Sequence, residues 1–210
     1  RDSVTWGAYV QDEIALAERW SLDLGLRYDH YYTFGGTTNP RAALIYQPDE
    51  RTAWKLVAGR AFRAPNAYES YYGDGFSGKA NPDLDPETIV TYEAIFERHF
   101  AHSLRASASV YYYEIDDLIV QTIDPLDGLL VFQNSASASG PGAELELEQR
   151  WANGMRLRGS LAVQDIEDES GAESPNSSDH VAQLLYETPC FTPRLIAGVK
   201  RLTQGVGSGW

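Results

Sequence analysis

The stretch WSLDLGLRYDHY, residues 20–31, alternates between apolar and polar residues along its whole length. The apolar set is Trp20, Leu22, Leu24, Leu26 and Tyr28, and the polar set is Ser21, Asp23, Gly25, Arg27 and Asp29. A period of two residues is that of a β-strand with two unlike faces, whereas an amphipathic helix repeats its apolar residues every three or four positions. The stretch therefore predicts a strand.

The same alternation recurs along the chain and predicts an all-β protein of about ten strands. The candidate strands are 4–14, 20–31, 41–47, 53–61, 89–100, 104–114, 142–151, 155–164, 181–187 and 194–202. Several reach ten residues, although strands of soluble proteins average about five or six. A tilted strand that crosses a membrane needs about 9–11 residues. Strand length therefore favours a transmembrane barrel.

The links between the candidate strands alternate in length. Short links are expected at 15–19, 47–51, 100–103 and 151–154, and long ones at 31–40, 62–88, 115–141 and 165–180. Antiparallel strands with tight turns at one end and large loops at the other are typical of outer-membrane barrels. Aromatic residues near the strand ends suit membrane-interface girdles: Trp6, Trp20, Tyr28, Tyr31, Tyr32, Phe100, Tyr111 and Trp151. A soluble sheet with one solvated face would show the same alternation, so a β-sandwich or solenoid stays open at this point.

Charge and composition exclude several other classes. The formal net charge of −13 argues against nucleic-acid binding, which requires clustered Lys and Arg to neutralise phosphates. The chain has no run of about 18 apolar residues, so no transmembrane helix is predicted. This does not argue against a transmembrane barrel, because only every second residue of its strands faces lipid. The single Cys and the scattered His residues predict no metal site, and no cofactor is expected. The absence of a GxSxG-type motif argues against an enzyme.

Two proline-containing boxes flank the first of the very long links. The first is FRAP, comprising Phe62, Arg63, Ala64 and Pro65, and the second is NPDLDPE (81–87), in which Asn81, Pro82, Leu84, Pro86 and Glu87 stand out. Proline fixes its own φ and disfavours helix at the preceding residue, so the first box predicts the end of a strand. Asn-Pro suits a turn. These nine residues are expected to terminate strands and anchor a loop.

The two boxes resemble those of TonB-dependent receptors, in which an external loop joins an FRAP-like box to an NPxL-xPE-type box. Similar stretches occur in family order at WGAYVQDEIAL (6–16), LDLGLRYDHY (22–31), NPRAALIY (39–46) and SASGPGAELELE (137–148). The resemblance implies an antiparallel transmembrane β-barrel of 22 strands with a plug. Twenty-two strands of about ten residues exceed this chain. Residues 1–210 are therefore expected to be a C-terminal barrel section truncated at both ends, without the plug, the energy-coupling segment or a signal peptide.

The resemblance also implies a function. The expected protein lies in the outer membrane of a Gram-negative bacterium, surrounded by lipid, and imports a scarce small extracellular ligand such as an iron–siderophore, cobalamin or haem. A TonB-type protein would supply the energy through the absent N-terminal part. Four loop aromatics, Tyr68, Tyr71, Tyr72 and Phe76, are expected to contact the ligand, because aromatic rings give large contact area at low entropic cost. A passive porin-like channel and a soluble β-rich binding domain are the alternatives.

Overall fold

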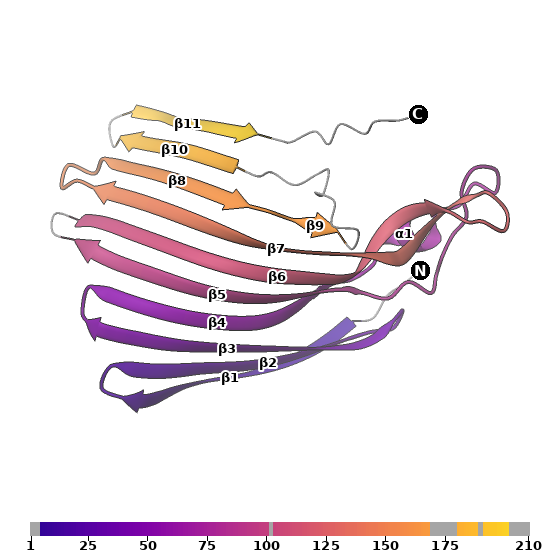
Figure 1. The fold of residues 1–210 in the computed structure, drawn as a ribbon, viewed down its shortest axis with the longest axis horizontal. Helices are drawn as coiled ribbons and strands as arrows, with labels where there is room; N and C mark the ends of the chain where they lie inside the picture. The colour runs from indigo at the N-terminus through magenta and orange to yellow at the C-terminus, as the bar shows by residue number, and fades with distance from the viewer. Residues whose placement is uncertain (1–4, 101–102, 169–179, 189–190, 202–210) are drawn as a thin grey trace.

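One curved antiparallel sheet makes up almost all of the structure. The computed structural model describes residues 5–100, 103–168, 180–188 and 191–201. The strands are β1 (Thr5–Ala17), β2 (Trp20–Tyr31), β3 (Gly35–Asp49), β4 (Thr52–Arg63), β5 (Glu87–Phe100), β6 (Leu104–Ile123), β7 (Leu130–Arg150), β8 (Arg156–Gln164), β9 (Glu167–Asp168), β10 (His180–Thr188) and β11 (Phe191–Arg201). A short helix, α1 (Ala67–Tyr71), lies between β4 and β5 (Figure 1). The predicted all-β class is confirmed.

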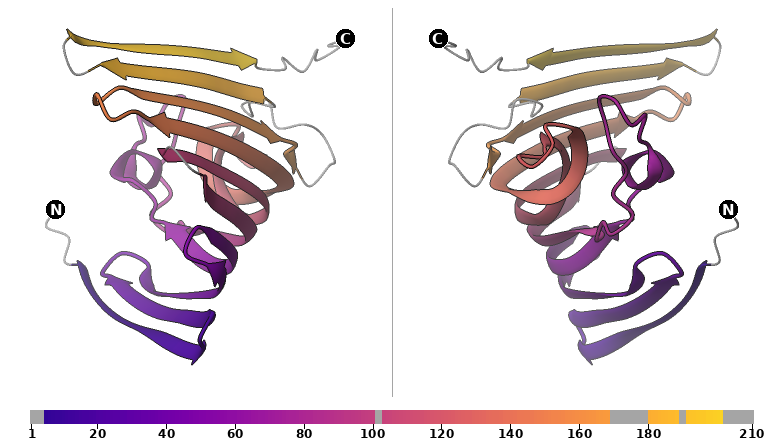
Figure 2. Two further views of the ribbon diagram at one scale, coloured as in Figure 1. Left: turned by 90° about the vertical axis from the view of Figure 1, so that its left-hand side faces the viewer. Right: turned by 90° about the vertical axis from the view of Figure 1, so that its right-hand side faces the viewer.

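Each long strand pairs with the next one along the chain. The order is β1 to β8, then β10 and β11, and the two-residue β9 pairs with β7 beside this path. The sheet curves into an open trough whose edges are β1 and β11 (Figure 2). Tight turns lie at one end, which we call the turn end, and 32–34, 64–86 and 124–129 lie at the other, the loop end. In the described part of the chain, no helix has the length and apolar character needed to cross a membrane.

The outer face of the trough is apolar and carries a ladder of aromatic rings near the turn end. Trp20 pairs in register with Tyr46, Tyr46 with Trp54, and Trp54 with Phe96, so one row crosses four strands. The Trp20 and Tyr46 rings stack at 4.4 Å, and Trp54 lies 4.5 Å from Phe96. This row has the composition of an interfacial girdle.

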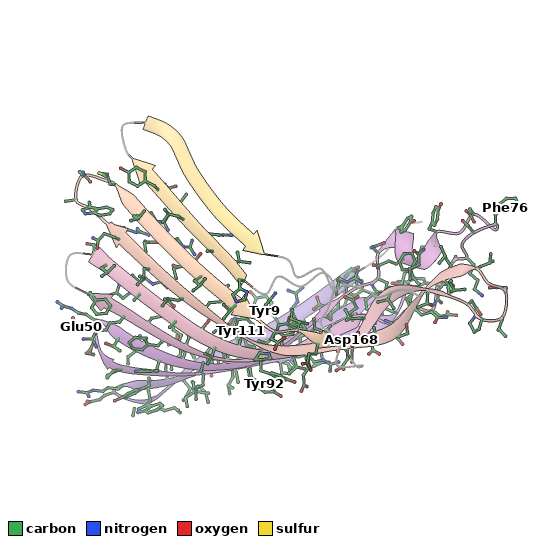
Figure 3. All side chains as sticks on the ribbon, turned by 45° about the horizontal axis from the view of Figure 1, so that its top comes forward. Tyr9, Glu50, Phe76, Tyr92, Tyr111 and Asp168 are labelled. Carbon is green, nitrogen blue, oxygen red and sulfur yellow. The ribbon has the colours of Figure 1, made fainter. Side chains whose placement is uncertain are left out.

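A second aromatic level lies on the outer face toward the loop end, where the rings of Trp6 and Tyr28 are 5.4 Å apart. Tyr28 is eight residues from Trp20 on β2, about 26 Å along a strand. Allowing for strand tilt, this separation suits the apolar band of an outer-membrane barrel, roughly 25 Å tall. Tyr111, predicted among the girdle residues, instead lies on the concave inner face, whereas Tyr92 lies on the outer face (Figure 3).

The inner face is polar and is crossed by ion pairs. Glu97 on β5 pairs with Lys55 at 3.1 Å and with Arg105 at 3.3 Å. Glu148 on β7 pairs with Arg156 at 2.6 Å. Only three hydrophobic residues are buried in the described part of the chain, namely Ala43, Leu84 and Val131. A β-sandwich of this length would bury a much larger core between two sheets. The sheet is instead a single wall with one wet and one apolar face.

Two of the links predicted to be long are mostly strand. In 31–40, residues 32–34 form the turn and β3 begins at Gly35, opposite Tyr31. In 115–141, β6 and β7 continue as a hairpin whose turn is 124–129. The alternation breaks at Asp117, which takes a positive φ of 58° at a β-bulge, and the strand then resumes. A second irregularity between Leu118 and Ile119 restores the register, so the regular alternation is interrupted only locally. In the sequence, this interruption looks like the end of the strand.

Two further elements were not predicted. Helix α1 lies inside 62–88, which was expected to contain only loop, and it contains a single turn. Glu167 and Asp168 of β9 pair with Ser139 and Ala138 inside the predicted link 165–180. Residues 169–179 of that link lie outside the described residues.

The β7–β9 contact depends on a glycine. A Cβ added to Gly140 would lie 1.9 Å from the carbonyl oxygen of Asp165, and this backbone also holds the 3.0 Å bond from the Asp165 N–H to the Pro141 carbonyl. We expect Gly140→Ala to displace 165–168 and to destabilise the barrel by about 1–2 kcal/mol. Urea unfolding of the barrel in lipid vesicles measures this. Gly159→Ala is the control, because its Cβ would meet Leu184 at an ordinary 3.8 Å; an equal loss in both variants would contradict the account.

Candidate functional site at the loop end

An arginine joins the two boxes. Arg63, the last residue of β4, pairs in register with Glu87, the first residue of β5. Its Nε and Nη2 each donate to Glu87 at 2.5 Å, and its Nη1 donates to the two carboxylate oxygens of Glu69 at 3.0 and 3.1 Å. Bidentate arginine–carboxylate pairs are among the stronger and more directional hydrogen bonds in proteins. We call Arg63, Glu69 and Glu87 the box latch.

The latch also holds strand β6. Glu87 is 9% exposed, and its Oε1 accepts a hydrogen bond from the backbone N–H of Ile119 at 2.8 Å. Ile119 follows the bulge at Asp117, where the regular ladder is interrupted. A buried carboxylate is tolerated only when charge and hydrogen-bond partners compensate its desolvation. Glu87 therefore joins three separate segments: the end of β4, the start of β5 and the upper part of β6.

The sequence after FRAP folds as a capped helical turn. Asn66 is the N-cap: its side chain accepts from the Glu69 N–H at 2.9 Å, while Glu69 accepts from the Asn66 N–H at 2.8 Å. This reciprocal pair is a capping box, and Pro65 precedes it with a fixed φ. Glu69 thus serves both the helix cap and the latch. The capping-box pattern Asn66-x-x-Glu69 is present in the sequence. The helical turn was not predicted because the pattern lies inside a segment that was expected to be loop.

The second box is fastened to the β6–β7 hairpin. The Asn81 side chain donates to the Phe132 carbonyl at 2.8 Å. Asn134 accepts from the Asp85 N–H at 2.9 Å and donates to the carbonyls of Asp85 and Asp117 at 2.8 and 2.7 Å. Leu84 is 3% exposed. Of the remaining box residues, Phe62 and Arg63 end β4, Ala64, Pro65 and Pro82 lie in the loop, and Pro86 directly precedes β5.

The four predicted ligand-contact aromatics do not form one cluster. Tyr68 and Tyr72 stack on each other with ring centroids 4.5 Å apart, and Tyr68 meets Phe132 edge-on at 5.8 Å. Tyr71 faces a different space, described below. Phe76 lies at the far tip of the loop end and is 91% exposed (Figure 3). Contact with a ligand stays a prediction for all four.

Tyr71 lines a hollow of about 1220 Å³ between the β2–β3 turn and the loop after FRAP. Tyr31, Tyr32 and Phe34 form one side, and Pro65, Tyr71 and Leu84 are among the residues of the other. We call this space the crown hollow. Its first side was missed in the sequence, because the run YYTF (31–34) was assigned to an interfacial girdle and a long link.

The crown hollow lies where the wall divides. Pairing between β3 and β4 ends at Arg41 and Gly59, although β2–β3 pairing continues to Gly35 and β4–β5 pairing continues to Arg63. Pro40 directly precedes Arg41 in the chain and lies on its loop-end side. It has no N–H to donate to β4. The β2–β3 turn therefore separates from β4 and leaves room between them.

A lysine clasp holds the tip of the loop against the hairpin turn. Lys79 pairs with Asp124 and, at 2.8 Å, with Asp127. Its backbone N–H also bonds to the Leu130 carbonyl at 2.9 Å. The hydrogen bond from Lys79 lowers the pKa of both carboxyl groups, and Asp124 in turn raises the pKa of Lys79.

The clasp is expected to open in acid. A lowered carboxyl pKa contributes stability above the ordinary Asp value of 3.8, and this contribution is lost as the pH falls through the shifted values. A spin label at Phe76→Cys, in a Cys190→Ser background, should therefore become more mobile below about pH 3.8. In Lys79→Met the label should be mobile at every pH. Equal mobility of the label in both proteins at pH 7 would show that Lys79 does not hold the tip of the loop against the hairpin turn.

Comparison with known proteins agrees with the geometry of the sheet, which is that of an outer-membrane barrel wall. Residues 1–207 match the family described as TonB dependent receptor-like, beta-barrel. The iron-regulated outer membrane virulence protein of Vibrio cholerae is 26% identical over 75% of this chain and 25% of its own length. The vitamin B12 transporter BtuB of Vibrio cholerae is 30% identical over 78% of this chain and 25% of its own length. The chain thus spans about a quarter of these curated relatives.

Solved structures show the same fold. The siderophore receptor PirA from Acinetobacter baumannii aligns with a TM-score of 0.72 at 17% identity, over 96% of this chain and 35% of that protein. The ferric enterobactin receptor PfeA from Pseudomonas aeruginosa, solved as a mutant with enterobactin, aligns with a TM-score of 0.73 at 22% identity, over 94% and 32%. Together with the sequence match, this establishes that the chain belongs to the TonB-dependent receptor-like β-barrel family of the Gram-negative outer membrane.

Proposed function

We propose that this chain forms part of the barrel wall and of the extracellular crown of an energy-coupled outer-membrane importer. The loop end would face the outside of the cell and the turn end the periplasm. The observation that carries the proposal is the box latch, in which Arg63, Glu69 and Glu87 hold a loop, a helical turn and a hairpin together at the mouth of the wall. Such a fixed crown suits ligand capture, because binding then costs less ordering entropy.

The cargo class follows from the relatives and is part of the proposal. Two relatives are named for iron regulation and for vitamin B12 transport, so an iron–siderophore, cobalamin, haem or a similar scarce compound is the proposed ligand. A complete barrel of 22 strands, a plug within it and a TonB-type protein in the inner membrane complete the proposed machine. The polar inner face suits contact with such a plug through water and ion pairs. The family consists of receptors and transporters, and import requires no covalent chemistry on the ligand.

Growth on single nutrient sources tests this function. A strain that lacks the gene is supplied with one iron chelate, with haem or with cobalamin at limiting concentration. We expect the deletion to abolish growth on one source, and the intact gene to restore it in a strain with a working TonB protein but not in a strain without one. Equal growth of the deletion and parent strains on all sources would refute import.

A further inference from the structure

The crown hollow is lined by uncharged groups. Tyr31, Tyr32, Phe34 and Tyr71 supply rings, and the other described residues that line it are apolar or carry hydroxyl or amide groups. None of the described lining residues carries a formal charge. An anion that loses water on entering such a space would find hydrogen-bond donors but no compensating cation, which makes its burial costly.

The cations nearest to the hollow in sequence are already engaged. Arg63 is bound to Glu87 and Glu69, and Lys79 is bound to Asp124 and Asp127. Residues 63–87 contain two cations against five carboxylates, and residues 114–129 contain five carboxylates and neither Lys nor Arg. These two segments of the loop end therefore carry an excess of negative charge. A surface of one sign concentrates ligands of the opposite sign and repels those of its own.

One wall of the hollow is a fixed aromatic panel. The Tyr31 ring stacks on Phe34 at 4.6 Å and meets the edge of Phe62 at 5.7 Å, so two neighbours restrict its orientation. Leu84, nearly fully buried, borders the hollow on the NPDL side. Aromatic rings present flat faces on which a planar ligand group can stack. The hollow, at about 1220 Å³, is somewhat larger than the roughly 300–1,000 Å³ of ordinary small-molecule pockets.

We infer that the crown hollow receives an uncharged, ring-bearing face of a ligand whose net charge is zero or positive. This rests on the proposed import function and narrows its cargo: anionic chelates are excluded, and neutral or cationic ones are selected. The selection comes from two sources. The described residues that line the hollow include no cation, and the carboxylates of 63–87 and 114–129 at the loop end repel anions.

Binding of three probes to the full-length protein in detergent tests the inference. The probes are cyanocobalamin, which is uncharged, ferrioxamine B, a cationic iron chelate, and ferric enterobactin, an anionic one. We expect cyanocobalamin or ferrioxamine B to bind more tightly than ferric enterobactin. Any weak affinity for ferric enterobactin should increase as added salt screens the repulsion. Tightest binding of ferric enterobactin, an affinity for it that falls with salt, or binding of none of the three overturns the inference.

Substitutions locate the binding in the hollow. Tyr71→Ala should weaken the preferred probe about fivefold, because one stacking face is lost. Tyr112→Ala is the matched control, since Tyr112 lies on the outer face and cannot reach the ligand. Equal affinities of the two variants would overturn the assignment to the hollow, and heat-modified migration in gels shows that both are folded. If the inference fails while the nutrient-growth test succeeds, the protein imports an anionic cargo by another site; if growth fails, import itself is refuted.

Discussion

The substitution Leu56→Arg is expected to destabilise the folded barrel in a phospholipid bilayer by about 2–4 kcal/mol. Leu56 lies on the outer face, 59% exposed, and follows the aromatic ladder at Trp54 by one step on the same face of β4. An arginine there would be surrounded by lipid and would have to reach the interface to keep its hydration. Urea unfolding in vesicles, followed by tryptophan fluorescence, measures the loss.

The neighbouring residue provides the control. Val57 lies on the inner face, in register with Glu93 on β5. Val57→Arg should therefore stay within about 1 kcal/mol of the parent, because the new charge meets water and a carboxylate. If both variants lose the same free energy, the assignment of the outer face to lipid is wrong.

The second large effect is expected at the box latch. Arg63→Ala would leave Glu87 buried with the Ile119 N–H as its remaining partner, and would leave Glu69 with only the helix cap. Removing a charged partner from a buried hydrogen-bonded group costs about 1.5–3 kcal/mol, and the partial exposure of Arg63 keeps the value within that range. We expect the loop 64–86 to detach, so that protease added to intact cells cleaves it at least tenfold faster.

Two other arginine variants separate charge from geometry. Arg63→Lys keeps the charge but loses the bidentate fork, so its cleavage rate should lie between those of the parent and Arg63→Ala. Arg60→Ala removes a cation three residues earlier on the same strand, on the outer face and outside the latch, and should leave the rate unchanged. Equal cleavage of the Arg60 and Arg63 variants would show that the latch does not hold the loop.

The alternating strands could be predicted from sequence because each strand has one lipid-facing and one wet face. In 20–31 this gives the pattern without interruption, and the expected ends match β2. The class of the barrel required the FRAP and NPDLDPE boxes, since alternation alone also fits a soluble sheet. The small number of buried hydrophobic residues in the described structure then distinguishes a transmembrane barrel from a soluble sheet.

Other features depend on tertiary contacts that leave no local signal. The continuation of β6 past Asp117 requires a bulge, and the Glu87 side chain satisfies the Ile119 N–H beyond it from another strand. The separation of β3 from β4 creates the crown hollow. It arises because β2–β3 and β4–β5 pairing continues beyond the point where β3–β4 pairing ends, and no single sequence motif marks that point. Tyr71 is therefore a candidate residue that the sequence predicts, whereas Tyr31 and Tyr32 carry a sequence pattern that fits an interfacial girdle.

The central claim is that this chain is a wall of an outer-membrane barrel with its loop end outside the cell. Phe76 and Glu50 lie at opposite ends of that wall (Figure 3). In the full-length protein with Cys190→Ser, each is replaced by cysteine, and intact cells are treated with a polyethylene-glycol maleimide too large for outer-membrane pores. We predict labelling of Phe76→Cys in intact cells, and of Glu50→Cys only after the outer membrane is broken. Labelling of Glu50→Cys in intact cells, or of neither until lysis, would contradict it.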